Sequence, residues 1–86
     1  MSYTVEFEPN AIEDLDCLDK TIRERILTKI NWLSNNFDQI KPQALTGDFS
    51  DFFKFRVGDY RVLYDFSRTE QLITVIRIRH RSEVYS

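Results

Sequence analysis

The spacing of apolar residues changes from helical to alternating near the middle of this chain, and that change constrains the fold most strongly. Up to about residue 33, apolar side chains recur every three or four positions, as on an amphipathic helix. From residue 53 they recur at every second position, as on a half-buried strand. A length of 86 residues leaves room for one domain, over residues 1–86. The pattern therefore predicts a single α+β domain whose helices precede most of its strands.

The N-terminal half predicts one short strand followed by a hairpin of two helices. Alternating apolar residues indicate a half-buried strand that ends at Pro9; they are Tyr3, Val5 and Phe7. Asn10, with Glu13 three positions later, is expected to cap the first helix. Residues 21–24 have the capping-box pattern of a second helix, and residues 35–36 are expected to end it. Residues 37–51 contain Pro, Gly and three Asp, which favours a surface loop with a few apolar anchors.

Two strands around Gly58-Asp59 are expected to form a β-hairpin. A two-residue loop that begins with glycine suits a type II′ turn. On one face this turn pairs apolar residues, namely Val57 with Tyr60, Phe55 with Val62 and Phe53 with Tyr64. On the other face it places Arg56 beside Arg61 and Lys54 beside Leu63. Both faces thus agree on one register.

A third strand is expected from about Leu72 to Arg79, and its register depends on the preceding turn. A five-residue turn directs alternate residues toward the helices, namely Leu72, Thr74, Ile76 and Ile78. Arg77 and Arg79 then lie on the opposite face. A four-residue turn inverts the assignment and directs Arg77 at the helices. Because burying an unpaired arginine is costly, the five-residue turn is preferred.

Basic side chains gather on one face of this predicted sheet, although the net charge is −2. They are Lys54, Arg56, Arg61, Arg77 and Arg79, with Arg81 just beyond. Like charges on adjacent strands repel, so either nearby acids neutralise them or an anion binds there. Asp59, Asp65 and Glu83 are the candidate counterions of a solvated face. The planar fork of arginine favours phosphate recognition instead.

Several classes of site are excluded by residue counts. His80 is the single histidine, so a two-histidine ribonuclease site is impossible, although His80 and Tyr85 remain candidate acids or bases. Cys17 is the single cysteine, which leaves no disulfide and no cysteine-based zinc site. We expect no cofactor, and most aromatic residues, Trp32 included, are expected in the core. No apolar run approaches the roughly 18 residues of a membrane span, so we expect a cytoplasmic protein.

Three segments resemble the RelE/ParE toxins of bacterial and archaeal toxin–antitoxin systems. They are LTG at 45–47, FKFRVGDYRVLY at 53–64 and IRHRSEVY at 78–85. The resemblance extends over nearly the whole chain. It implies an N-terminal strand and a two-helix hairpin packed on a small antiparallel sheet, in the order β-α-α-β-β-β.

For the RelE-like branch, the resemblance implies ribosome-dependent cleavage of mRNA without a metal, through attack of the substrate's own 2′-OH. The implied catalytic residues, by their positions in the motifs, are Lys54, Arg56, Arg61, Arg81 and Tyr85, with Tyr85 as general base. The remaining basic residues of this region are expected to contact RNA, namely Arg77, Arg79 and His80.

The resemblance also implies partners. These are a cognate antitoxin that covers the basic groove, the ribosome with its mRNA, and DNA only indirectly through the antitoxin; no membrane is expected. Two alternatives remain open, a ParE-like gyrase poison and a non-toxic module that only binds an antitoxin. The joint presence of the five implied catalytic residues favours the nuclease, and the acidic pI of about 5.3 moves some weight to the alternatives.

Overall fold

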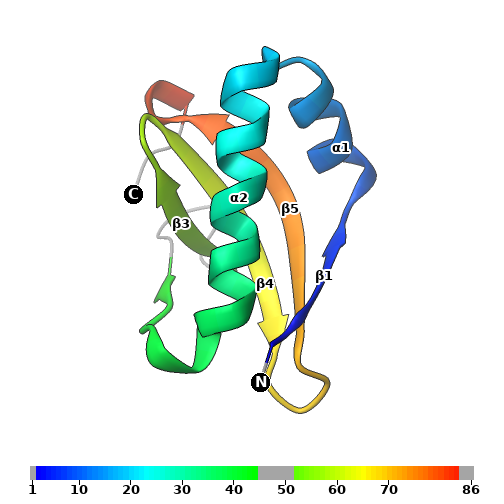
Figure 1. Ribbon diagram of the computed structural model, residues 1–86, viewed down its shortest axis with the longest axis vertical. Coiled ribbons are helices and arrows are strands. Elements are labelled where there is room, and N and C mark those ends of the chain that lie inside the picture. Colours follow the sequence, from blue (N-terminus) through cyan, green and yellow to red (C-terminus); the bar gives the residue numbers. More distant parts are fainter. Residues whose placement is uncertain (1, 45–51, 84–86) are drawn as a thin grey trace.

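Two helices lie against one face of a five-stranded sheet in the computed structural model, which describes residues 2–44 and 52–83 (Figure 1). In chain order the elements are β1 (Thr4–Phe7), α1 (Pro9–Asp16), α2 (Lys20–Asn36), the 3-10 turn η1 (Phe37–Gln39), β2 (Gln43–Ala44), β3 (Phe53–Val57), β4 (Tyr60–Ser67), β5 (Leu72–His80) and the 3-10 turn η3 (Arg81–Glu83). The strand order is β1-β5-β4-β3-β2. The predicted α+β class, with a strand and a helical hairpin before the main strands, is confirmed.

The sheet is mixed, whereas the resemblance implied an antiparallel one. β1 runs parallel to β5, with Thr4 opposite Leu72 and Phe7 opposite Val75. Parallel neighbours need a long connection, and here the helices and three strands lie between them in sequence. The short strand β2 also falls inside the expected surface loop and pairs with Phe53 and Lys54 of β3.

The β3–β4 hairpin has the predicted register. Val57 lies opposite Tyr60, and Arg56 lies opposite Arg61. Gly58 has a φ of +58°, and Asp59 does not share this positive φ. A positive φ at the first loop position alone is the requirement of a type II′ turn, which glycine meets without steric cost.

The register of β5 follows the four-residue turn in the first half of the strand and the register expected of the five-residue turn in the second half. Ser67 pairs with Leu72, so the β4–β5 turn has four residues, the length that the sequence made less favourable. Its last residue, Gln71, adopts a φ of +53°. As a result Ile73 and Val75 face the helices, and the assignment of Leu72, Thr74 and Ile76 to that face is wrong.

A β-bulge then restores the preferred arrangement in the second half of β5. Tyr64 pairs with Val75 but the adjacent Leu63 pairs with Arg77, so Ile76 is an extra residue on β5. An extra residue reverses which side chains point to each face. Beyond it, Ile78 joins the core while Arg77 and Arg79 fall on the opposite side of the strand, as predicted.

The helix starts differ from the predicted capping residues. α1 begins at Pro9, because the backbone N–H of Glu8 still donates to Val75 of β5 and holds Glu8 extended. Proline suits the first helical position, so no side-chain cap by Asn10 forms. α2 is capped by Asp19, whose carboxylate accepts the Ile22 N–H at 3.0 Å. α2 ends at Asn36, as predicted.

Two adjoining apolar clusters fill the space between helices and sheet. One contains Ala11, Leu15, Ile26, Ile30, Val57, Val62, Val75 and Ile78. The other contains Tyr3, Leu33, Phe37, Tyr64 and Ile73. Phe37 is one of the apolar anchors of the expected loop: it is fully buried, and its ring contacts Tyr3, Tyr64 and Phe66. This ring anchors the chain as it leaves α2.

We predict that Phe37→Ala lowers the free energy of unfolding by about 3–5 kcal/mol, because a fully buried aromatic ring leaves a cavity when truncated. The matched control is Ile12→Ala on the exposed side of α1, where we expect a change within about 0.5 kcal/mol. Urea denaturation followed by circular dichroism measures both. Equal losses for the two variants would contradict the anchoring role of Phe37.

Candidate nucleic-acid interface

Two rows of side chains cross the sheet on the face turned away from the helices. The first is the arginine row, Arg56 on β3, Arg61 on β4 and Arg79 on β5, each directly opposite the next. The second row consists of Lys54, Leu63 and Arg77. Residues directly opposite in antiparallel strands have Cβ atoms about 4.5–5.5 Å apart. The predicted gathering of these basic residues on one face is therefore present; this surface is called the basic face below.

Arg81 joins one end of the basic face through the β3–β4 turn. Its backbone N–H donates to the carbonyl of Asp59 at 2.7 Å, which holds η3 against the turn. Its Nε also lies 3.8 Å from Oδ1 of Asp59, with both side chains more than half exposed. An exposed pair at this distance contributes little stability, so the Arg81 guanidinium can exchange this carboxylate for another anion.

The central basic residues have only weak contacts within the described part of the chain. Arg56 donates from Nε to the carbonyl of Gly58 at 3.3 Å, and Arg61 donates to the carbonyl of Tyr60 at 3.3 Å. The side chain of Lys54 forms no hydrogen bond or ion pair with residues 2–44 or 52–83. Asp65, a candidate counterion, instead accepts the Phe66 N–H at 2.9 Å. Within these described residues, no carboxylate therefore neutralises the side chains of Lys54, Arg56 and Arg61.

Arg77 differs, because a carboxylate 63 positions away in sequence binds its guanidinium. Asp14 of α1 accepts from Nε at 2.9 Å and from Nη2 at 3.1 Å, and it also accepts the Ile78 N–H at 2.9 Å. β1 pairs with β5 only as far as Val75, so Asp14 occupies the strand edge beyond that point. The charge of Arg77 is thus offset within the domain. Sequence reasoning missed Asp14, since no local pattern links residues so far apart.

The same contacts determine how Asp14 titrates. Burial would raise the pKa of Asp14, but the hydrogen bonds from Arg77 and Ile78 and the charges of Arg77 and Arg79 outweigh it. Together they lower the pKa of Asp14 below its ordinary value of 3.8. The ionised form is therefore the one that the folded domain stabilises.

His80 lies on the other side of the sheet from the arginine row. It is opposite Tyr60, and the two rings meet edge to face with centroids 5.3 Å apart. Its Nδ1 accepts the backbone N–H of Ser82 at 3.2 Å and lies 2.9 Å from Oγ of Ser82. The structure therefore does not group His80 with the basic face. Tyr85, the predicted general base, lies outside the described residues, as do the side chain of Glu83 and the LTG segment.

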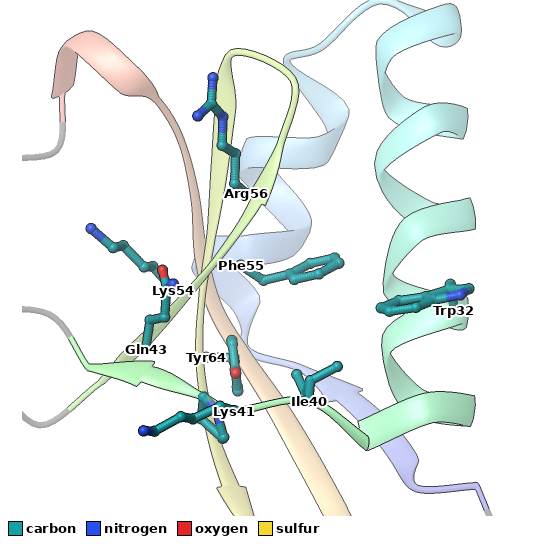
Figure 2. Close-up of a pocket in the computed structure, with 9 residues that line it drawn as sticks. Trp32, Ile40, Lys41, Gln43, Lys54, Phe55, Arg56 and Tyr64 are labelled. Carbon is teal, nitrogen blue, oxygen red and sulfur yellow. The ribbon is translucent and has the colours of Figure 1, made fainter. Parts of the chain in front are cut away.

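A pocket of about 290 Å³ opens at the edge of β3, between α2 and the chain that follows η1 (Figure 2). Its lining residues are Trp32, Ile40, Lys41, Pro42, Gln43, Lys54, Phe55, Arg56 and Tyr64. Trp32, expected in the core, is 47% exposed. Its position outside the apolar stripe of α2, formed by Ile26, Ile30 and Leu33, was the sequence signal for this. Burial raises the pKa of Tyr64 to about 12, despite the charge of Arg68, so its hydroxyl is a neutral group here.

The sequence matches, over residues 5–85, the family described as the ParE toxin of the type II toxin-antitoxin system, parDE. The chain belongs to the ParE toxin family. The predicted membership of the RelE/ParE superfamily is confirmed, and the chain is by family a toxin of a type II toxin–antitoxin system. No curated protein sequence matches it.

Solved structures similar to this ParE-family chain come from toxin–antitoxin systems of bacteria and archaea. The RelBE2 toxin–antitoxin complex of Mycobacterium tuberculosis contains a chain with 26% identity and a TM-score of 0.83, over 95% of this chain and 94% of that one. The RelE–RelB complex of Pyrococcus horikoshii gives 24% identity and a TM-score of 0.75, over 98% and 100%. A mutant of E. coli RelE in the free state has 22% identity and a TM-score of 0.76, over 96% of this chain and 87% of that one. The last two show likeness of fold.

Membrane-spanning helices and metal clusters are both absent from the described residues of this ParE-family chain. Among the described residues, no helix combines the length and the apolar character needed to span a bilayer. The same residues contain no cluster of three or more His, Cys, Asp or Glu side chains with the geometry of a metal site.

We predict that Asp14→Asn lowers the free energy of unfolding by about 1–3 kcal/mol at pH 7, because a charged hydrogen-bond acceptor is lost. A carboxyl with a lowered folded-state pKa stabilises the fold fully above its unfolded pKa of about 3.9. That contribution disappears as the pH falls through this value toward the lower folded pKa. The variant should therefore approach the wild type in stability near pH 2–3.

Denaturant titrations at several pH values test this prediction. Asp16→Asn is the matched control, because Asp16 is an exposed residue on the same helix. A stability gap between wild type and Asp14→Asn that stays constant down to pH 2 would contradict the role of the ionised carboxylate.

Proposed function

We propose that this toxin cleaves mRNA on the ribosome by transesterification. The observation that carries the proposal is the arginine row, in which Arg56, Arg61 and Arg79 lie opposite one another on adjacent strands, with Arg81 held against the nearby β3–β4 turn. The weak contacts of Arg56 and Arg61 support it, because these side chains can turn to a substrate without breaking strong bonds. The likeness of fold to RelE chains is consistent with the same proposal.

In the proposed reaction the substrate supplies its own nucleophile. The 2′ oxygen bonds to the adjacent phosphorus while the bond from phosphorus to the 5′ oxygen breaks, leaving a 2′,3′-cyclic phosphate and a 5′-OH. Tyr85 accepts the proton of the 2′-OH as general base, and the ammonium group of Lys54 donates a proton to the leaving 5′ oxygen. No metal ion or cofactor enters this proposal.

Stabilisation of the charge on phosphate is the task assigned to the arginines. Arg61 occupies the centre of the row, and its fork can contact two non-bridging oxygens at once. Arg81 approaches from the end of the hairpin. Lys54 and Arg56 orient the RNA backbone, and Arg79 adds positive potential.

The proposed partner is an antitoxin, as in the RelBE2 and RelE–RelB complexes that this chain resembles in fold. Acidic residues on such a partner would complement the basic face and speed its association. The ribosome and its mRNA are the proposed substrates, the cytoplasm is the proposed location, and residues 1–86 are proposed to form a single toxin domain. Contacts with operator DNA are assigned to the antitoxin.

A gyrase poison is the second candidate, because the matched family carries the ParE description. The net charge of −2 also fits a surface that contacts a protein rather than a long nucleic acid. A non-toxic module that only binds an antitoxin is the remaining alternative. Both differ from the nuclease proposal in what happens to RNA and DNA within cells.

Brief induction of the toxin without its neighbouring antitoxin separates these candidates. We expect cuts within translated messages, mapped by sequencing of new 5′ ends, and unchanged plasmid supercoiling. Double-strand DNA breaks with intact messages would replace the nuclease proposal by the gyrase one. Normal growth with neither change would leave only antitoxin binding.

We predict that Arg61→Ala and Arg81→Ala each reduce single-turnover cleavage on ribosomes about 10²–10³-fold, since each removes one donor to the developing charge. Thermal stability should change little, because neither guanidinium has a strong partner in the described structure. Arg25→Ala, an exposed arginine on α2, is the matched control and should retain full activity. Undiminished growth arrest by the Arg61/Arg81 double variant would refute this assignment of the site.

A further inference from the structure

We propose that the pocket at the β3 edge binds one nucleobase of the RNA strand whose phosphates lie on the basic face, and that this base stacks on Trp32. The inference rests on the proposed RNA substrate and extends it, because it assigns a base-binding subsite to residues outside the predicted catalytic set. Three features of the pocket carry the argument, namely its aromatic wall, its charges and its continuity with the basic face.

The aromatic wall consists of two rings from different elements. Trp32 projects from α2 and Phe55 from β3, and Figure 2 shows both rings at the pocket. Their planes are 8° from parallel and their centroids are 6.3 Å apart. Phe55 packs against the core and thus has a fixed position, while Trp32 keeps 47% of its surface exposed. A half-exposed indole held beside a fixed ring is a ready surface for stacking a flat base.

The charges around the pocket are of one sign. Lys41, Lys54 and Arg56 line it, and no carboxylate does so among the described residues. An apolar floor with several cations at its rim matches an aromatic ring attached to a phosphate backbone. An apolar side chain of a peptide would use the floor equally well but would need acidic neighbours to match the rim. A nucleotide and an acidic peptide both meet this charge requirement, and the half-exposed indole beside a parallel ring favours the nucleotide as occupant.

The pocket and the basic face are connected over the edge of β3. β2 pairs with Phe53 and Lys54 only, so in the described structure the edge from Phe55 onward has no neighbouring strand. Alternation along β3 directs Phe55 toward the helices and Lys54 and Arg56 toward the basic face (Figure 2). An RNA strand can thus keep its phosphates on Lys54 and Arg56 while one base turns over the edge into the pocket.

Trp32 is the single tryptophan of the chain, so its fluorescence reports directly on the pocket. The probes are a 2′-O-methyl hexanucleotide, which cannot be cleaved, and the same backbone without bases. We expect the hexanucleotide to quench the Trp32 fluorescence of the free toxin in a saturable way. The base-free strand should bind about tenfold more weakly and should not quench the fluorescence. Quenching by an acidic peptide but not by RNA would assign the pocket to a protein partner and overturn the inference.

Substitutions connect the pocket with cleavage. Trp32→Ala should reduce cleavage of ribosome-bound mRNA about tenfold at low toxin concentration, and Trp32→Phe should retain most of the activity because a stacking ring remains. Leu27→Ala is the matched control, since Leu27 is 40% exposed on α2 and does not line the pocket. Circular dichroism checks that all three variants remain folded.

The two proposals fail in different ways. Normal cleavage by Trp32→Ala, with no quenching of the wild type by the hexanucleotide, would overturn the subsite and leave the nuclease intact. Base-dependent quenching in a toxin that cuts no message would refute the nuclease and support a base-binding pocket. Loss of cleavage in Leu27→Ala equal to that in Trp32→Ala would also overturn the specific role of the indole.

Discussion

The pairing of β4 with β5, and the bulge within it, determines which side chains this domain buries and which it exposes. Before the bulge, Val75 closes the apolar core; after it, Arg77 and Arg79 emerge on the opposite face. A continuous register would have turned either the core residues or the arginines to the wrong side. The single extra residue, Ile76, lets one nine-residue strand serve both purposes. The basic face therefore depends on a local irregularity of the backbone.

Short-range patterns in the sequence were sufficient to predict the register of the β3–β4 hairpin and the end of α2. Gly58-Asp59 fixes the turn, and the alternation on both sides then fixes every pair. The bulge, the parallel pairing of β1 with β5 and the Asp14–Arg77 pair could not be predicted, because each depends on residues far apart in sequence that meet only in the folded chain. The start of α1 could not be predicted either, because the hydrogen bond from the Glu8 N–H to Val75 of β5 sets it, rather than a capping side chain.

The net charge of the chain is a poor guide to its surface, because the two halves carry opposite balances. Residues 1–40 hold four basic and eight acidic residues, and residues 41–86 hold eight basic and six acidic ones. The first set forms β1 and the helices, and the second forms most of the sheet. Packing the helices on one face of the sheet therefore separates the acids from the arginine row. Asp14 is an exception, and it offsets Arg77 rather than the centre of the row.

β3 unites the two parts of the proposed RNA site because it lies near the edge of the sheet. In a central strand, the residues on either side of Phe55 would be separated from it by the neighbouring backbone. In the described structure β2 pairs only with the beginning of β3, so a strand of RNA can pass around the remaining edge from one face of the sheet to the other. Period-two alternation then places the fixed ring of the pocket, Phe55, between two cations, Lys54 and Arg56, within three consecutive residues. A strand edge that is otherwise prone to pairing with other chains becomes useful when charged side chains flank it.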